Sequence, residues 1–183
     1  MKIIETKITD ILILEPKVFG DERGYFFESY TKRVFDDLVG TEYEFVQDNE
    51  SKSSYGVLRG LHYQLAPYTQ AKLVRVLQGR VYDVAVDLRK DSPTYGEWVG
   101  AELSSENKKQ FLIPKGFAHG FCVLSETATF AYKCDEYYRP EAERGIIYND
   151  PTLAIDWKVK DVDVLVSDKD RVLPELADAD INF

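Results

Sequence analysis

The stretch Lys72–Arg89, KLVRVLQGRVYDVAVDLR, places one valine-rich run on each side of Gln78-Gly79. Both runs alternate in a way typical of β-strands, and the glycine supplies a turn between them. After the turn, even-numbered side chains from Tyr82 onward share one face, and odd-numbered ones, which include Asp83, share the other. The stretch therefore predicts a β-hairpin.

The first run of this stretch also predicts a cavity. Lys72 has the same parity as Val74 and Val76, so it points inward if the valines do. A lysine on an inward face is unfavourable unless it meets water, an anion or a carboxylate. Lys72 is thus the first indication of a pocket that holds a polar ligand.

Most of the remaining chain also predicts short strands. They are expected over residues 10–19, 24–30, 98–104, 109–114, 120–125 and 127–138. Residues 31–40 predict the one early helix, and residues 167–176 a short helix and turn. Many strands and few helices indicate an all-β double-sheet jelly roll or barrel, in one domain over residues 1–183. Exposed outer strands of such folds are often covered by another subunit, which favours a homodimer.

Composition excludes several classes of protein. The net charge of −9 disfavours a nucleic-acid binder. Cys122 and Cys134 have neither zinc-finger spacing nor companions for a disulfide framework. The N-terminus carries charges too early for a signal peptide, and no run approaches the ~18 apolar residues of a membrane span. We therefore expect a soluble cytoplasmic protein.

The only two histidines, His62 and His119, are the candidates for chemistry. Each could be a metal ligand, a packed core residue or a base. A jelly-roll metal site usually needs several close histidines and a carboxylate, so this pair disfavours a metal centre. The residues alone leave the core and catalytic interpretations open.

Six motifs, taken in their order along the chain, favour the catalytic interpretation of the two histidines. They are FGDERGYFFESY (19–30), FVQDNESKS (45–53), RGLHYQ (59–64), AKLVR (71–75), PKGFAHGF (114–121) and FAYKCDEYY (130–138). Together they resemble the dTDP-4-dehydrorhamnose 3,5-epimerase family over about residues 11–170. The resemblance implies a cupin-type jelly roll, that is, a double-stranded β-helix with a few short peripheral helices. It also implies epimerisation at C3 and C5 of dTDP-4-dehydro-6-deoxy-D-glucose, giving dTDP-4-dehydro-L-rhamnose for rhamnose biosynthesis.

The resemblance assigns roles to residues of this sequence. His62 takes the role of general base, Tyr132 that of proton donor, and Lys72 lies near the substrate ketone. Asp168 and Asp170 both offer a carboxylate for His62, and the family pattern fits Asp170 better. The resemblance also implies the substrate-binding residues His119, Arg23, Arg59, Lys169, Gln47, Asp48, Asn49, Glu28, Glu143 and Tyr138. Of these, Tyr138 would stack on thymine, and the first motif could act across a homodimer with a shared nucleotide site.

Elementary chemistry is consistent with these roles. Inverting a carbon next to a ketone means removing its proton and returning one to the opposite face. A histidine with an ordinary pKa of about 6.5 suits the removal, and a lysine or histidine can stabilise the enolate oxygen. No net redox occurs, so no metal, nicotinamide or flavin is expected.

One geometric condition and several rival functions remain. Strict alternation puts Arg59 and His62 on opposite faces, so both reach one pocket only if Gly60 marks a bulge or Arg59 curls around an edge. The rivals are a 3-epimerase, a 3,4-ketoisomerase, a metal-dependent cupin oxygenase and a non-catalytic sugar-nucleotide-binding module.

Overall fold

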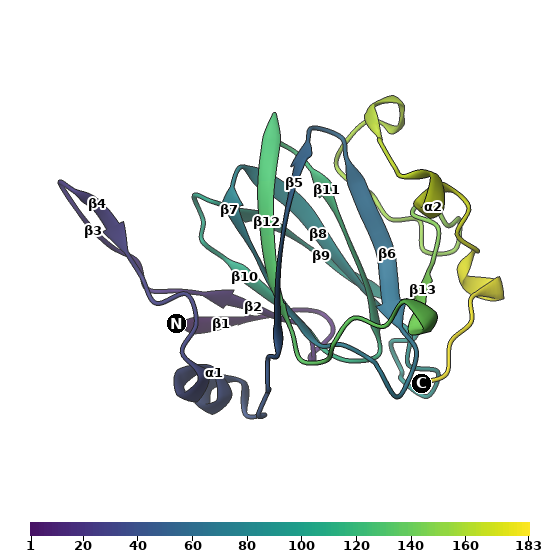
Figure 1. The fold of residues 1–183 in the computed structure, drawn as a ribbon, viewed down its shortest axis with the longest axis horizontal. Coiled ribbons are helices and arrows are strands. Elements are labelled where there is room, and N and C mark those ends of the chain that lie inside the picture. Colours follow the sequence, from purple (N-terminus) through teal and green to yellow (C-terminus); the bar gives the residue numbers. More distant parts are fainter.

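Two antiparallel sheets form the body of the protein, which is described over residues 1–183 by a computed structural model (Figure 1). The six-stranded sheet has the order β1 (Lys2–Glu5), β2 (Leu12–Glu15), β10 (Gln110–Ile113), β7 (Lys72–Gln78), β12 (Thr127–Cys134) and β5 (Gln47–Ser54). The five-stranded sheet has the order β13 (Glu143–Gly145), β6 (Leu58–Gln64), β11 (Phe117–Val123), β8 (Arg80–Asp87) and β9 (Trp98–Ser104).

Residues 72–89 form two strands as expected, but the predicted hairpin is wrong. Strand β7 pairs with β10 and β12, whereas β8 pairs with β11 and β9 in the other sheet. Gly79 carries the chain between the sheets with φ of 78°, where an added Cβ would lie 2.1 Å from the Thr127 carbonyl oxygen. Alternation shows which face a strand buries, but it does not show which strand lies beside it.

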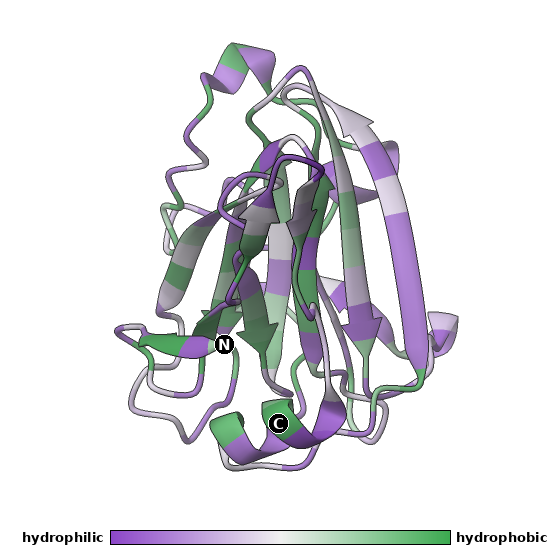
Figure 2. Ribbon diagram, turned by 90° about the vertical axis from the view of Figure 1, so that its left-hand side faces the viewer, coloured by the Kyte–Doolittle hydropathy of each residue, from purple (hydrophilic) through white to green (hydrophobic).

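The main core lies between the two sheets. Val74 and Val76 of β7 pack in one cluster with Val81 and Ala85 of β8. Bands of hydrophobic residues recur along the strands, whereas a strand at the edge of the fold is hydrophilic along its length (Figure 2). The inward direction of Val74 and Val76, on which the orientation of Lys72 depends, is thereby confirmed.

Each sheet is also covered on its outer face. Helix α1 (Lys32–Val39) buries Phe35 with Leu14, Leu73 and Leu112 of the six-stranded sheet. The C-terminal segment covers the outer face of the five-stranded sheet, where Trp157 joins the second core cluster. This segment contains α2 (Asp168–Arg171) and two of the three 3₁₀ turns, which span Pro140–Ala142, Asp161–Asp163 and Leu176–Asp178. No helix is long and apolar enough to cross a membrane.

A small hairpin projects from the body (Figure 1). Its strands, β3 (Phe19–Asp21) and β4 (Gly24–Phe26), pair only with each other. Phe19 and Phe26 are 54% and 66% exposed, which is unusual for side chains of their size. Strand β4 lies within the predicted segment 24–30, whereas β3 shares only Phe19 with the predicted segment 10–19 and extends into the predicted turn.

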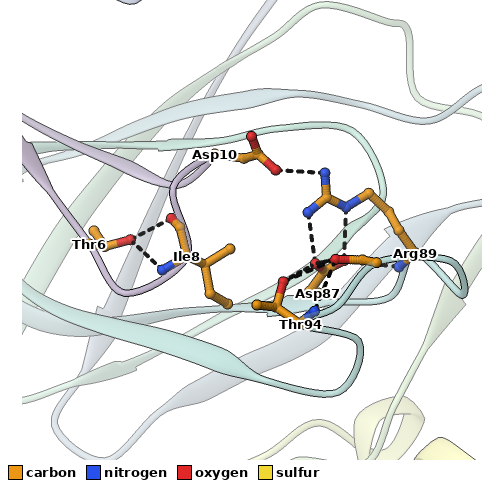
Figure 3. A network of polar contacts seen from close by, with 7 residues as sticks. Thr6, Ile8, Asp10, Asp87, Arg89 and Thr94 are labelled. Carbon is orange, nitrogen blue, oxygen red and sulfur yellow. Dashed lines mark hydrogen bonds and ion pairs between the residues drawn. The ribbon is translucent and has the colours of Figure 1, made fainter.

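A polar network ties the end of β8 to the β1–β2 loop (Figure 3). The fully buried carboxylate of Asp87 accepts hydrogen bonds from Arg89, Ser92 and Thr94. Arg89 also donates to Asp10, at 2.7 Å between Nη1 and Oδ2. Every oxygen of the buried carboxylate is thus paired, as burial of a charge requires.

Candidate active site

A cavity of about 510 Å³ opens between the sheets and the C-terminal segment. A second hollow of about 280 Å³ adjoins it, and the two share His62, Lys72 and Tyr132. The larger cavity is also lined by Arg59, His119, Lys169 and Asp170, and the smaller one by Gln47, Asn49, Tyr138 and Glu143. The structure therefore brings most of the expected site residues around one continuous hollow.

His62 and Asp170 form a hydrogen-bonded pair in this cavity. Nε2 of His62 lies 2.7 Å from Oδ1 of Asp170, and the histidine side chain is 28% exposed. Asp170 is buried on α2, where its backbone N–H donates to the capping hydroxyl of Ser167. Asp168, the other candidate carboxylate, is fully exposed. The imidazole thus faces the cavity with a carboxylate behind it.

The carboxyl group of Asp170 stays ionised near neutral pH. Burial tends to raise its pKa, but hydrogen bonds from His62 and from the backbone N–H of Gly60 outweigh burial and hold the pKa below its ordinary value. An ionised Asp170 accepts a hydrogen bond from the Nε2–H group of His62, which leaves the Nδ1 lone pair free.

A bulge at Gly60 brings Arg59 and His62 to the same cavity. His62 lies opposite His119 and Arg59 lies opposite Phe121, so two residues of β6 face one residue of β11. Gly60 has φ of 125°, and an added Cβ would lie 2.5 Å from the Gly120 Cα. Of the two alternatives that the sequence left open, the structure shows the bulge at Gly60.

Lys72 and Tyr132 stand on adjacent strands of the six-stranded sheet, β7 and β12. Burial lowers the pKa of the Lys72 ammonium and raises the pKa of the Tyr132 hydroxyl. Neither Lys72 Nζ nor Tyr132 Oη makes a hydrogen bond within the chain. Both groups are therefore available to a ligand in the cavity.

His119 is buried and paired with a carboxylate that the sequence interpretation missed. Its Nε2 lies 3.0 and 3.1 Å from the two oxygens of Asp83, and its ring stacks on Phe130. Burial lowers the pKa of His119 and raises the pKa of Asp83, and their mutual attraction opposes both shifts. The available signal was an acidic residue on the inward face of a valine-rich strand.

A polar cluster lies at the smaller hollow. Glu143 accepts hydrogen bonds from Tyr138 Oη at 2.7 Å and from Lys169 Nζ at 2.5 Å. The Tyr138 backbone N–H donates to Gln47, whose amide donates to Asn49. The hydrogen bond to Glu143 raises the pKa of Tyr138 to about 12. These contacts fix several polar groups at one side of the cavity.

Three expected binding residues lie away from the cavity of their own chain. Asp48 is on the opposite face of β5 and forms an ion pair with Lys133. Arg23 lies at the tip of the β3–β4 hairpin and pairs with Asp21. Glu28 borders a separate hollow beside that hairpin. Strand β5 was not foreseen, and its alternation turns Gln47 and Asn49 inward but Asp48 outward.

Cysteines and acidic residues form no cluster of the kind that holds a metal ion. No group of three or more His, Cys, Asp or Glu side chains is arranged to hold a metal ion. Cys122 and Cys134 are both buried and free, and burial raises the pKa of each thiol to about 11.

Comparison with known proteins identifies this arrangement. The family model described as dTDP-4-dehydrorhamnose 3,5-epimerase matches residues 5–178. The chain belongs to this epimerase family. It is 58% identical to the dTDP-4-dehydrorhamnose 3,5-epimerase of Shigella flexneri over 180 residues, which are 98% of each chain.

Solved structures of epimerases in this family share the fold. The crystal structure of dTDP-4-dehydrorhamnose 3,5-epimerase from Elizabethkingia anophelis has a TM-score of 0.93 and 56% identity, with 97% of each chain covered. The dTDP-6-deoxy-D-glucose-3,5-epimerase of Legionella pneumophila, in complex with dTDP-4-keto-L-rhamnose, has a TM-score of 0.94 and 56% identity over 98% of this chain and 94% of that one. The predicted cupin-like jelly roll is thus confirmed, and the chain is an isomerase of dTDP-sugar metabolism.

Proposed function

We propose that this epimerase uses His62 to remove the protons next to the ketone of dTDP-4-dehydro-6-deoxy-D-glucose. Inversion at C3 and C5 then gives dTDP-4-dehydro-L-rhamnose. The observation that carries the proposal is the 2.7 Å contact between His62 Nε2 and Asp170, with the imidazole open to the cavity. Since Asp170 holds Nε2, Nδ1 is the nitrogen that accepts the substrate proton. A positioned base contributes roughly 10²–10⁴-fold in rate.

The opposite walls of the cavity support inversion rather than simple exchange. His62 stands on β6 of the five-stranded sheet, whereas Tyr132 stands on β12 of the six-stranded sheet. A sugar ring between the sheets has the base on one side and the tyrosine hydroxyl on the other. Tyr132 therefore delivers a proton to the face opposite the one from which His62 removed it.

One set of hydrogen-bond donors serves both inversions. C3 and C5 flank the same ketone carbon, so negative charge develops on the same oxygen during each proton removal. Lys72 and His119 both line the cavity and supply the stabilising groups for that oxygen. Arg59 and Lys169, on the same cavity, supply the diphosphate contacts against a chain of net charge −9.

The nucleoside occupies the smaller hollow in this proposal. Gln47 and Asn49 supply amide groups for the base or ribose, and Tyr138 supplies an aromatic face for thymine. Glu143 holds Tyr138 and Lys169 together. Asp48 faces away from this hollow, so its own contribution is limited to backbone contacts unless the ligand reaches around the strand.

We also propose a homodimer in which the β3–β4 hairpin reaches the partner's cavity. The hairpin projects from the body, exposes Phe19 and Phe26, and carries Arg23 away from its own site (Figure 1). Such exposed aromatic side chains are typical of an interface. Arg23 and Glu28 would then act on nucleotide bound by the other subunit.

A cytoplasmic location stays a prediction, which cell fractionation tests.

Incubation with dTDP-4-dehydro-6-deoxy-D-glucose in deuterated water tests the main proposal. Deuterium at both C3 and C5 of the product supports it, and deuterium at C3 alone selects a 3-epimerase. Movement of the ketone to C3 selects a ketoisomerase, and the absence of label would contradict removal of the protons next to the ketone. His62→Ala should abolish exchange but leave thymidine diphosphate binding nearly unchanged. An equal loss of binding would point to a structural histidine.

A further inference from the structure

Asp83 is a buried carboxylate that the proposed mechanism leaves without a role. It is 0% exposed on β8, between the core residues Val81 and Ala85. Its only side-chain hydrogen bonds go to Nε2 of His119, at 3.0 and 3.1 Å. A carboxylate among apolar side chains is strongly unfavourable unless a partner offsets the free-energy cost of removing its charge from water. The partner here is a residue that lines the cavity, so the carboxylate acts on the site through His119.

His119 and His62 make the same contact in different surroundings. Each imidazole uses Nε2 to bind a carboxylate, and each leaves Nδ1 without a protein partner. Asp170 receives additional hydrogen bonds, and its pKa is held down, so it stays ionised and His62 keeps a free Nδ1 lone pair. Asp83 receives no other hydrogen bond, and its burial favours keeping a proton.

The proton balance of the Asp83–His119 pair decides what Nδ1 can do. If the pair holds one proton beyond neutral histidine and ionised aspartate, that proton occupies the Nε2–Asp83 contact and Nδ1 carries an N–H. This is true for imidazolium with carboxylate and also for neutral imidazole with carboxylic acid. Without the extra proton, Nε2 keeps its hydrogen and Nδ1 can only accept.

We propose that Asp83 is a positioning residue that holds His119 through Nε2 and keeps Nδ1 protonated, so that His119 donates a hydrogen bond to the ketone oxygen as the enolate forms. The role of His119 as an enolate donor rests on the proposed function, whereas its protonation state does not. The two histidines thus serve as opposite reagents, an acceptor at His62 and a donor at His119, because their carboxylate partners differ in burial and hydrogen bonding.

Other charged groups face this pair and set its titration. Lys72 of β7 disfavours a further positive charge on His119, and its own charge favours ionised Asp83. His62 of β6, opposite His119 on the adjacent strand, acts in the same direction as Lys72 on His119. Phe130 of β12 covers the ring without charge. Burial of Asp83 is the influence that retains the proton against these groups.

Nitrogen NMR of the ¹⁵N-histidine-labelled protein tests the proposal directly. The chain has two histidines, so His62→Asn assigns both sets of ring signals. Near pH 7.5 we expect a protonated Nδ1 at His119 and an unprotonated Nδ1 at His62. An unprotonated Nδ1 at His119 would overturn the proposal, whatever the outcome of the deuterium experiment.

Two substitutions at Asp83 extend the test to turnover. Asp83→Asn keeps a hydrogen bond to Nε2, because its amide can donate to that nitrogen, and we expect kcat within about tenfold of the parent. Asp83→Leu suits the apolar surroundings of residue 83 but removes the hydrogen-bond partner of His119 Nε2. We expect kcat to fall ~10²–10³-fold with little change in KM. In a His119→Ala background, Asp83→Leu should have almost no further effect on kcat. Full additivity of the two losses, or an Asp83→Asn loss as large as that of Asp83→Leu, would contradict the assignment.

Discussion

At the scale of single residues, the contact between His62 and Asp170 joins positions 108 apart in the chain. Asp170→Asn should lower kcat by roughly 10²–10⁴-fold, because an amide no longer fixes the imidazole tautomer that exposes Nδ1. Steady-state kinetics measure the loss, and thymidine diphosphate binding should stay close to that of the parent.

Asp168→Asn is a matched control for that change. It removes an equal charge two residues away on the same helix, but from a fully exposed side chain. We expect unchanged kcat. A comparable loss in both variants would mean that the charge of α2, rather than the contact with His62, matters.

Tyr132→Phe should separate proton exchange from inversion. His62 still removes the substrate proton, and its partly exposed ring exchanges that proton with solvent. Without the hydroxyl on the opposite wall, deuterium should return to the original face. NMR should therefore detect label in substrate of unchanged configuration, with product formation reduced ~10²–10⁴-fold. An equal fall of labelling and product would assign Tyr132 a role in proton removal instead.

Residue patterns predicted part of this site for a physical reason. The parity of Lys72 with buried valines identified it, because an inward lysine demands a polar cavity. Asp83 carried the same signal, and its pairing with His119 depends on two strands whose neighbours the sequence does not reveal. Asp170 needed the family resemblance, since nothing local connects a C-terminal aspartate to β6.

At the scale of elements, the bulge in β6 depends on Gly60. Gly60→Ala introduces a Cβ 2.5 Å from the Gly120 Cα and 2.7 Å from the His119 carbonyl oxygen, at φ of 125°. The backbone of β6 or β11 must move, which displaces His62. We expect the free energy of unfolding to fall by more than about 3 kcal/mol and epimerase activity to be lost.

Gly24→Ala isolates the backbone contribution to that cost. Gly24 has a similar φ of 129°, but its added Cβ would meet nothing within 4 Å. Strain alone should cost about 1–2 kcal/mol. Urea unfolding measures both variants, and equal losses would show that the contact with β11 is unimportant.

The Asp87 network predicts a specific acid sensitivity at the end of β8 (Figure 3). Burial tends to raise the pKa of Asp87, but hydrogen bonds from Arg89, Ser92 and Thr94 lower it to about 2. A depressed pKa means that the ionised group stabilises the fold above its unfolded pKa, near 3.8, and that this contribution disappears as pH falls toward 2. The contribution is about 2 kcal/mol.

Asp87→Asn should remove that stabilisation at pH 7 and flatten the dependence of stability on pH between 4 and 2. Chemical unfolding over that pH range measures both effects. Asp10→Asn is the control, since its half-exposed ion pair with Arg89 should contribute less than about 1 kcal/mol. An unchanged acid profile in Asp87→Asn would assign the sensitivity to another carboxylate.

The elements that the sequence predicted are those with a buried apolar face. Helix α1, with Phe35 inside and Gly40 as its C-cap, follows the expected range closely. Strand β5, QDNESKSS, was missed because its alternation divides cavity from solvent and involves no apolar residue. The sequence also could not predict which strands are hydrogen-bonded neighbours, as the separation of β7 and β8 into two sheets shows. Two tightly linked strands with apolar faces can either pair edge to edge or pack face to face.

At the scale of the whole molecule, the projecting hairpin predicts complementation between inactive variants. Arg23→Ala weakens the site of the partner, whereas His62→Ala inactivates its own site. Mixed dimers then hold one site with both residues intact, so an equal mixture should recover about a quarter of parental activity if subunits exchange freely. Sedimentation should show a dimer. No recovery with verified exchange would place Arg23 outside the shared site.

The position of Asp170 beyond all the strands has a consequence for biosynthesis. A ribosome completes both sheets, and with them most of the ligand contacts, before it delivers the carboxylate that orients His62. Because the same late segment forms one wall of the cavity, a nascent polypeptide completes its binding pocket and its catalytic pair together. Proteolysis that removes this late segment would therefore abolish capture of the sugar nucleotide as well as its conversion.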